Sequence, residues 1–75
     1  MERYKNLGGQ SGVYAFEIGS DYIKVQFNDG ATYLYNYSSA GSQNIQEMKR
    51  LANAGKGLNT FINKNVKKMY ATRLN

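Results

Sequence analysis

The chain has 75 residues and contains no cysteine, histidine, tryptophan or proline. Its length supports one small domain with one core. The missing side chains exclude disulfide bonds, the usual zinc ligands, an imidazole base and a thiolate nucleophile. Composition therefore favours a binding protein over an enzyme, and we expect no catalytic residue, no metal site and no cofactor.

Positive charge is concentrated in the last third of the chain. Residues 1–48 contain three basic and five acidic residues, for a net charge of −2, whereas residues 49–75 contain seven basic residues and no acid. The basic residues of this segment are Lys49, Arg50, Lys56, Lys64, Lys67, Lys68 and Arg73. Such asymmetry is typical of a chain that binds RNA or another anionic partner, and these seven are the candidate nucleic-acid-binding residues. The alternative is a solvated surface that serves only solubility.

No segment predicts a membrane span or a secretory signal. The longest apolar-rich run, residues 13–18, falls far short of the ~20 apolar residues that a spanning helix needs, and it contains Glu17. The N-terminal residues carry charge without an apolar stretch behind them. We therefore expect a cytoplasmic protein.

The first half of the chain predicts an arm followed by three strands. Residues 1–11 show little pattern and include two glycines, which favours a flexible N-terminal arm. Large apolar residues then alternate with small or polar ones over residues 13–18, around 23–27 and over 31–37, as in half-buried strands. This alternation predicts that Tyr14 is buried, and that Val13, Ala15, Lys24, Gln26, Thr32 and Leu34 share the uncovered face of the sheet.

The turn around Gly30 allows two hairpin registers. With a two-residue loop, Val25 lies opposite Leu34 and the nearby tyrosines form an exposed stacking platform. With a three-residue loop and Gly30 in a left-handed conformation, Val25 lies opposite Tyr33 and Ile23 opposite Tyr35, so the large side chains share one face. We favour the second register because it keeps the buried face consistent.

The second half of the chain predicts two helices. Apolar residues recur at three- and four-residue steps over residues 42–54, with Ser39 or Ser42 as the N-cap and Gly55 as the end. A second helix, capped by Asn59 or Thr60, has its apolar positions at Leu58, Phe61, Ile62, Val66 and Met69. The order predicts an α+β domain over residues 12–71, in which two helices cover one face of a three-stranded antiparallel meander, with a frayed tail at 72–75.

Several of these residues together resemble a known family. The pattern Phe27-x-x-Gly30-x-x-Tyr33-x-Tyr35, the polar-capped helix after it and Gly57-Leu58-Asn59 resemble the KTSC family, small domains named for the C-terminal region of lysyl-tRNA synthetases. The resemblance covers residues 11–66 and implies the β-β-β-α-α fold and RNA as a ligand. It also makes Tyr33 and Tyr35 the family's YxY motif, which the favoured register places in the core. A Val-Pro pair that follows this motif in many members is absent here.

Two binding functions of different class remain open. The first is weak, electrostatic and sequence-non-specific binding of RNA through the basic helical surface, with base stacking on Tyr4, Tyr22, Tyr37 or Tyr70. The second is a protein-interaction module, or a homodimer, that docks through the exposed face or edge of the sheet. Association of the last helix with anionic lipid is a third and weaker possibility.

Overall fold

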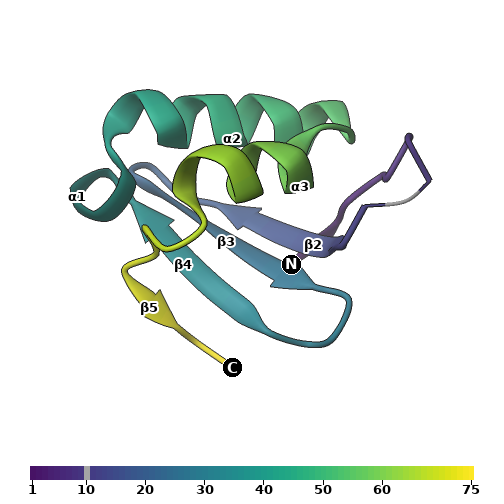
Figure 1. Cartoon of the computed structure of the whole chain (residues 1–75), viewed down its shortest axis with the longest axis horizontal. Coiled ribbons are helices and arrows are strands. Elements are labelled where there is room, and N and C mark those ends of the chain that lie inside the picture. Colours follow the sequence, from purple (N-terminus) through teal and green to yellow (C-terminus); the bar gives the residue numbers. More distant parts are fainter. Residues whose placement is uncertain (10) are drawn as a thin grey trace.

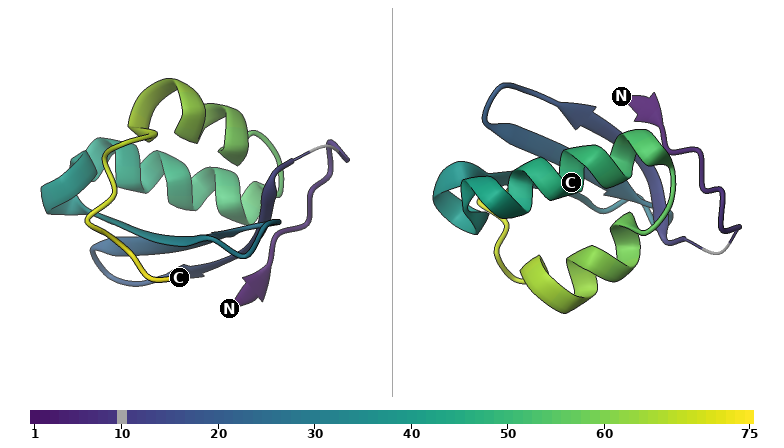
Figure 2. Two further views of the ribbon diagram at one scale, coloured as in Figure 1. Left: turned by 60° about the horizontal axis from the view of Figure 1, so that its bottom comes forward. Right: turned by 90° about the horizontal axis from the view of Figure 1, so that it is seen from above.

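A computed structural model describes residues 1–9 and 11–75 of the chain. It shows an α+β fold in which helices cover one face of an antiparallel sheet (Figure 1, Figure 2). The sheet has five strands in chain order, which are β1 (Glu2–Arg3), β2 (Val13–Ile18), β3 (Tyr22–Phe27), β4 (Thr32–Asn36) and β5 (Thr72–Arg73). The expected three-stranded meander forms its centre.

The two outer strands come from segments that were expected to lie outside the domain. β1 pairs with β2, and β5 pairs with β4, over two residues each. Tyr4, in the expected flexible arm, is 4% exposed and its hydroxyl accepts a hydrogen bond of 3.2 Å from the backbone N–H of Leu58. Thr32, expected on the open face, is buried and bonds through its carbonyl to the N–H of Leu74. Strands of two residues are too short to leave an alternating pattern, so the sequence did not indicate them.

The β3–β4 hairpin has the three-residue loop. Val25 pairs with Tyr33 and Ile23 with Tyr35, and Phe27 donates its backbone N–H to the carbonyl of Ala31 at 2.8 Å. Gly30 has φ +91°, a conformation that favours glycine. The favoured register is therefore confirmed, and it places the Tyr35 side chain in the core.

A bulge at the start of β2 changes the faces of its first residues. Val13 pairs with Phe27 but Ala15 pairs with Gln26, so the register shifts between them. Val13 is consequently in the core, whereas Tyr14 is 41% exposed. The expectation that Tyr14 is buried and Val13 exposed is wrong, because the extra residue breaks strict alternation. Ala15 is also buried, rather than open to solvent.

Two helices follow β4. A short helix, α1 (Tyr37–Ala40), begins at Asn36, whose side chain accepts the N–H of Ser39 at 2.8 Å. Because Ser39 completes this capping box from inside α1, it is not the N-cap of the next helix. That helix, α2 (Ser42–Ala54), has the predicted bounds and ends at Gly55, which has φ +80°.

The last helical segment begins at Leu58, after an N-cap at Gly57, rather than at Asn59 or Thr60. It consists of one α-helical turn, α3 (Leu58–Phe61), and a wider π-helical turn, η1 (Ile62–Val66). The chain then turns, with the N–H of Met69 bonded to the carbonyl of Val66 at 2.8 Å. Met69 is 46% exposed, so its predicted place on the buried face is wrong because the helix has already ended.

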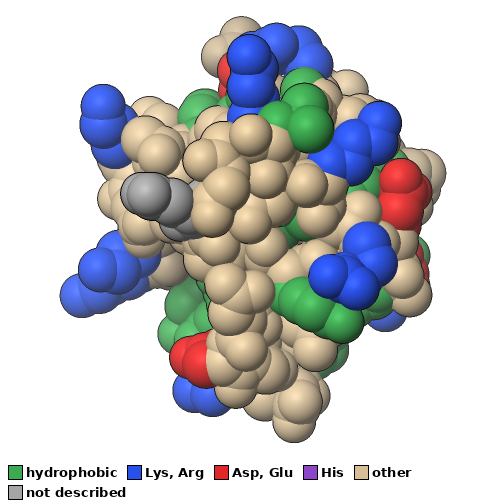
Figure 3. Space-filling view, turned by 90° about the vertical axis from the view of Figure 1, so that its right-hand side faces the viewer, with side chains coloured by type: hydrophobic (Ala, Val, Ile, Leu, Met, Phe, Trp, Pro, Cys, Tyr) green, Lys and Arg blue, Asp and Glu red, His purple; other side chains and the backbone are tan. Residues whose placement is uncertain are grey.

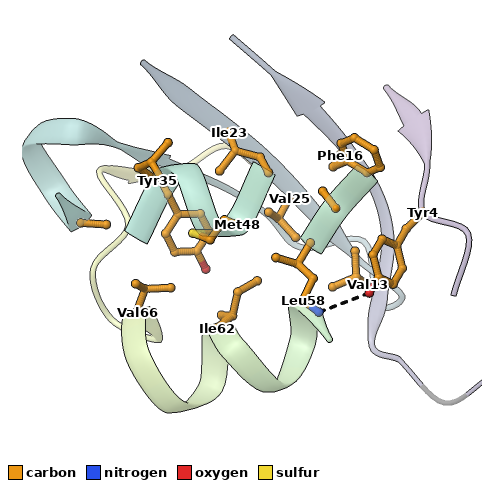
Figure 4. Packing of buried hydrophobic residues seen from close by; sticks show 13 residues of the cluster. Tyr4, Val13, Phe16, Ile23, Val25, Tyr35, Met48, Leu58, Ile62 and Val66 are labelled. Atoms are coloured by element: carbon orange, nitrogen blue, oxygen red, sulfur yellow. Dashed lines mark hydrogen bonds between the residues drawn. The ribbon is translucent and has the colours of Figure 1, made fainter. Parts of the chain in front are cut away.

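The core lies between the sheet and the helices (Figure 4). It takes side chains from β2, β3 and β4, from every helical segment and from Tyr4, which follows β1. Phe27, Tyr33, Leu51 and Phe61 pack against it half-buried. Its members are Tyr4, Val13, Phe16, Ile23, Val25, Tyr35, Ala40, Ile45, Met48, Ala52, Leu58, Ile62 and Val66.

The N-terminal segment packs so closely against Gly55 that a larger residue there should destabilise the fold. A Cβ on Gly55 would lie 2.6 Å from the Cβ of Lys5, whereas one on Gly57, which has a similar positive φ, would meet only a Leu51 methyl at 3.4 Å. Gly57→Ala should cost about 1 kcal/mol of unfolding free energy through backbone strain alone, and Gly55→Ala about 2 to 3 kcal/mol in urea denaturation.

A Lys5→Gly background supplies the control for this comparison. Removal of the Lys5 Cβ should reduce the cost of Gly55→Ala to that of Gly57→Ala. Equal costs for the two alanine variants in the otherwise unchanged chain would show that the N-terminal segment does not pack against Gly55.

Candidate nucleic-acid interface

The seven candidate basic residues do not form one continuous surface. On the face shown in Figure 3, Lys and Arg side chains lie at several separate places around the rim. Lys49, on α2, extends to the turn between β2 and β3, where its Nζ donates to the carbonyl oxygen of Ser20 at 3.0 Å and lies 5.8 Å from the centre of the Tyr37 ring. Its ammonium group is thus partly engaged by the protein itself.

Arg50 is paired within α2. Its Nε and Nη2 donate to the two carboxylate oxygens of Glu47 at 2.9 and 2.5 Å. The hydrogen bonds from Arg50 lower the pKa of Glu47 below its usual value, so the pair stays ionised at neutral pH. An exposed ion pair of this kind has no net charge to offer a phosphate.

Lys56 borders a different hollow from the one that Lys67 lines. It is exposed in the link between α2 and α3, and it borders a polar hollow of about 310 Å³ together with the N-terminal segment. The other residues around this hollow include Asn6, Ser11, Asn59 and Thr60.

Lys64, Lys67, Lys68 and Arg73 make up the basic set that stays exposed near the C-terminus. Lys67 comes four residues after Asn63 and three residues before Tyr70, and all three line the same groove. Lys64 lies in η1 and Lys68 in the turn after it, and both are exposed without lining the groove. Arg73, on β5, lies over the Tyr33 ring at 5.6 Å from its centre.

This aromatic groove has a volume of about 390 Å³ and lies between η1 and the β3–β4 hairpin. It is lined by Gly12, Phe27, Asn28, Asp29, Ala31, Tyr33, Tyr35, Ile62, Asn63, Lys67 and Tyr70. The groove therefore combines flat apolar surfaces with two amide side chains, one carboxylate and one ammonium group.

Aromatic contacts hold the walls of the groove in place. The ring centres of Tyr33 and Tyr70 are 4.7 Å apart, those of Phe27 and Tyr33 are 5.9 Å apart, and those of Tyr35 and Tyr70 are 6.4 Å apart. Tyr70 remains 40% exposed, so one of these rings is open to a ligand. Edge-to-face and tilted contacts of this kind stabilise ring positions.

The division of the tyrosines into buried and ligand-accessible residues agrees with the expectation only in part. Tyr35 is buried and Tyr33 is half-buried against the core, as the favoured register predicted. Tyr4, offered as a stacking residue, is buried and so cannot stack on a base. Only Tyr70 of the four suggested residues lines the aromatic groove. Sequence reasoning missed the contact between Tyr70 and Tyr33. The two residues are far apart in the sequence, and they meet because the chain returns along β4 as β5.

The described residues contain no group of three or more His, Cys, Asp or Glu side chains placed to hold a metal ion. Within the same part of the chain, no helix has the length and apolar character required to cross a membrane.

Tyr35 should titrate at unusually high pH. Its burial, with smaller effects of Tyr33 and Tyr70, raises its pKa to about 12, from about 10 in an unfolded chain. Above pH 10 the phenol of Tyr35 ionises in the unfolded chain while it is still protonated in the folded one. The stability that comes from keeping Tyr35 neutral is therefore complete below pH 10 and is lost as pH rises toward 12. In a titration of phenolate absorbance, Tyr35→Phe should remove amplitude only near pH 12. Removal of amplitude near pH 10 would show that Tyr35 is not shielded.

Comparison of the chain with protein-family models, with curated proteins and with solved structures finds no match in any of the three. The resemblance to the KTSC family, which rests on residues such as Tyr33 and Tyr35, gains no support from these comparisons. A function for the chain has to be inferred from the aromatic groove and the charges around it.

Proposed function

We propose that the protein is a non-catalytic module that binds single-stranded RNA weakly and without sequence specificity. The observation that carries this proposal is the aromatic groove bordered by Lys67 and Arg73. Proteins that bind single strands combine cations that follow the backbone with aromatic rings on which bases stack. RNA binding is also what the resemblance to the KTSC family implies, and membership of that family is part of the proposal.

The surface proposed for binding is narrower than the two-helix surface expected from charge alone. It consists of Lys64, Lys67, Lys68 and Arg73, because Arg50 is paired with Glu47, Lys49 is held at the β2–β3 turn and Lys56 borders the other hollow. Among the described residues, the ion pairs are those of Lys24 with Glu17 and Arg50 with Glu47, so these four cations are in none of them. Arg73 donates through Nε to the carbonyl of Asn75 at 3.0 Å, which leaves the other N–H groups of its guanidinium for a phosphate.

Aromatic surface adds a contribution that does not depend on salt. Tyr70 is 40% exposed and packs against Tyr33, so a base stacked on it would extend an existing series of rings. Stacking of a base on an aromatic side chain contributes about 1 to 3 kcal/mol, whichever the base. This contribution fits binding without sequence specificity.

Docking through the sheet edges, the competing function, has less support. The outermost strands are β1 and β5, which have two residues each. So short a strand offers little backbone for pairing with a second copy.

Salt dependence and charge reversal test the proposal. A fluorescent uridylate oligomer should bind more weakly as salt rises, with a slope of about 3 in log affinity against log salt for four phosphate contacts. Changing Lys64, Lys67 and Lys68 to Glu should lower that slope by about 2 and nearly abolish binding at about 200 mM salt.

A matched control carries the same charge change elsewhere. The variant with Lys5, Lys49 and Lys56 changed to Glu should keep most of the slope, since Lys5 packs against Gly55, Lys49 is held at the β2–β3 turn and Lys56 borders the other hollow. Circular dichroism checks that both triple variants are folded. Equal losses in the two variants would mean that only total charge matters, and no binding by the unchanged protein at low salt would remove the proposal.

A further inference from the structure

The floor of the aromatic groove carries a buried hydroxyl group that the protein itself does not use. Tyr35 is 1% exposed, yet it lines the groove. Figure 4 shows its ring extending from β4 toward Ile62 and Val66. Within the described part of the chain, the Tyr35 hydroxyl makes no hydrogen bond, whereas the hydroxyls of Tyr4, Tyr22 and Tyr37 all do.

This hydroxyl opens into the groove. No fully buried side-chain nitrogen or oxygen atom in the described residues lacks a hydrogen-bond partner, so the Tyr35 oxygen, which has none within the protein, keeps some exposed surface, and Tyr35 lines the groove. A hydroxyl in this position donates to water in the unbound protein, and a ligand that displaces that water binds best when one of its own polar atoms accepts the hydrogen bond instead.

The surroundings of the hydroxyl restrict the shape of that ligand. The rings of Phe27, Tyr33 and Tyr70 present flat surfaces above the floor, and Ile62 contributes an apolar patch beside it. Asn28, Asp29, Asn63 and Lys67 complete the lining. The lining suits a planar group with polar atoms on its edge and a negative charge attached to it.

We infer that the groove takes one unpaired nucleobase, inserted edge first, whose carbonyl oxygen or ring nitrogen accepts a hydrogen bond from the Tyr35 hydroxyl. This inference rests on the proposed function and specifies which part of the ligand enters the groove. One face of the base lies against the exposed ring of Tyr70, which itself packs on Tyr33, and its phosphate is within the field of Lys67. A sugar-phosphate without a base has no flat face for the rings, and a purely apolar ring leaves the Tyr35 hydroxyl unpartnered.

Replacement of one tyrosine tests the inference directly. Tyr35→Phe removes only the hydroxyl, which has no partner within the protein, so the variant should be at least as stable as the unchanged chain. It should nevertheless bind ligands that carry a base about tenfold more weakly. Tyr14→Phe is the control, since Tyr14 is exposed and does not line the groove.

Two pairs of ligands separate the contribution of the base to affinity from that of the sugar-phosphate backbone. Uridine 5′-monophosphate is compared with ribose 5-phosphate, and a uridylate oligomer is compared with an abasic oligomer of the same length, by calorimetry at constant salt. The base-carrying member of each pair should bind at least about tenfold more tightly through stacking and the Tyr35 hydrogen bond. Tyr35→Phe should lower affinity for that member and leave affinity for the base-free member unchanged.

The outcomes distinguish failure of the inference from failure of the proposed function. If the two oligomers bind equally while the Lys64, Lys67 and Lys68 charge-reversal variant still loses both, the base slot is wrong and electrostatic binding stands. If no oligomer binds but the mononucleotide does, with a loss in Tyr35→Phe, the slot is right and its ligand is a free nucleotide. Absence of base-dependent binding in both pairs, or an unchanged base affinity in Tyr35→Phe, overturns the inference.

Discussion

The pairing register of the β3–β4 hairpin is the constraint on which the rest of the structure depends. Gly30 adopts a positive φ that a three-residue loop requires, and this loop sets Val25 opposite Tyr33 and Ile23 opposite Tyr35. A shift of one residue would move every side chain of β4 to the other face. The core would then lose Tyr35, and the aromatic groove would lose its floor together with Tyr33, one of its walls.

The two ends of the chain complete the core and the aromatic groove that the hairpin residues begin. Tyr4, from the N-terminus, closes one end of the core and binds the first N–H of α3 through its hydroxyl. At the other end, the chain leaves η1, places Tyr70 against Tyr33 and then runs along β4 as β5. The groove therefore belongs to the junction of the hairpin with the C-terminal segment.

The aromatic groove brings exposed ring surface together with cations of the C-terminal segment. Of the seven cations after residue 48, Lys67 lines the groove and Arg73 lies over its Tyr33 ring, whereas Lys64 and Lys68 are exposed without lining it. The same acid-free segment also contains Lys49, which the structure uses to hold a turn. A cation that is close in sequence to a site is therefore not necessarily part of it, because each residue of a helix points about 100° away from the one before it.

The sequence by itself determined the α+β class, the bounds of α2 and the sign of the charge on the last third of the chain, and it favoured, of two possible hairpin registers, the one that the structure has. These features are local, since apolar periodicity, glycine conformations and side-chain charge act within one element. Tertiary structure alone decided that Tyr4 is buried, that Tyr14 is exposed, that two-residue strands extend the sheet and that Tyr70 meets Tyr33. Each of these depends on contacts between residues distant in the chain, and such contacts are set by how a whole core packs rather than by any short pattern.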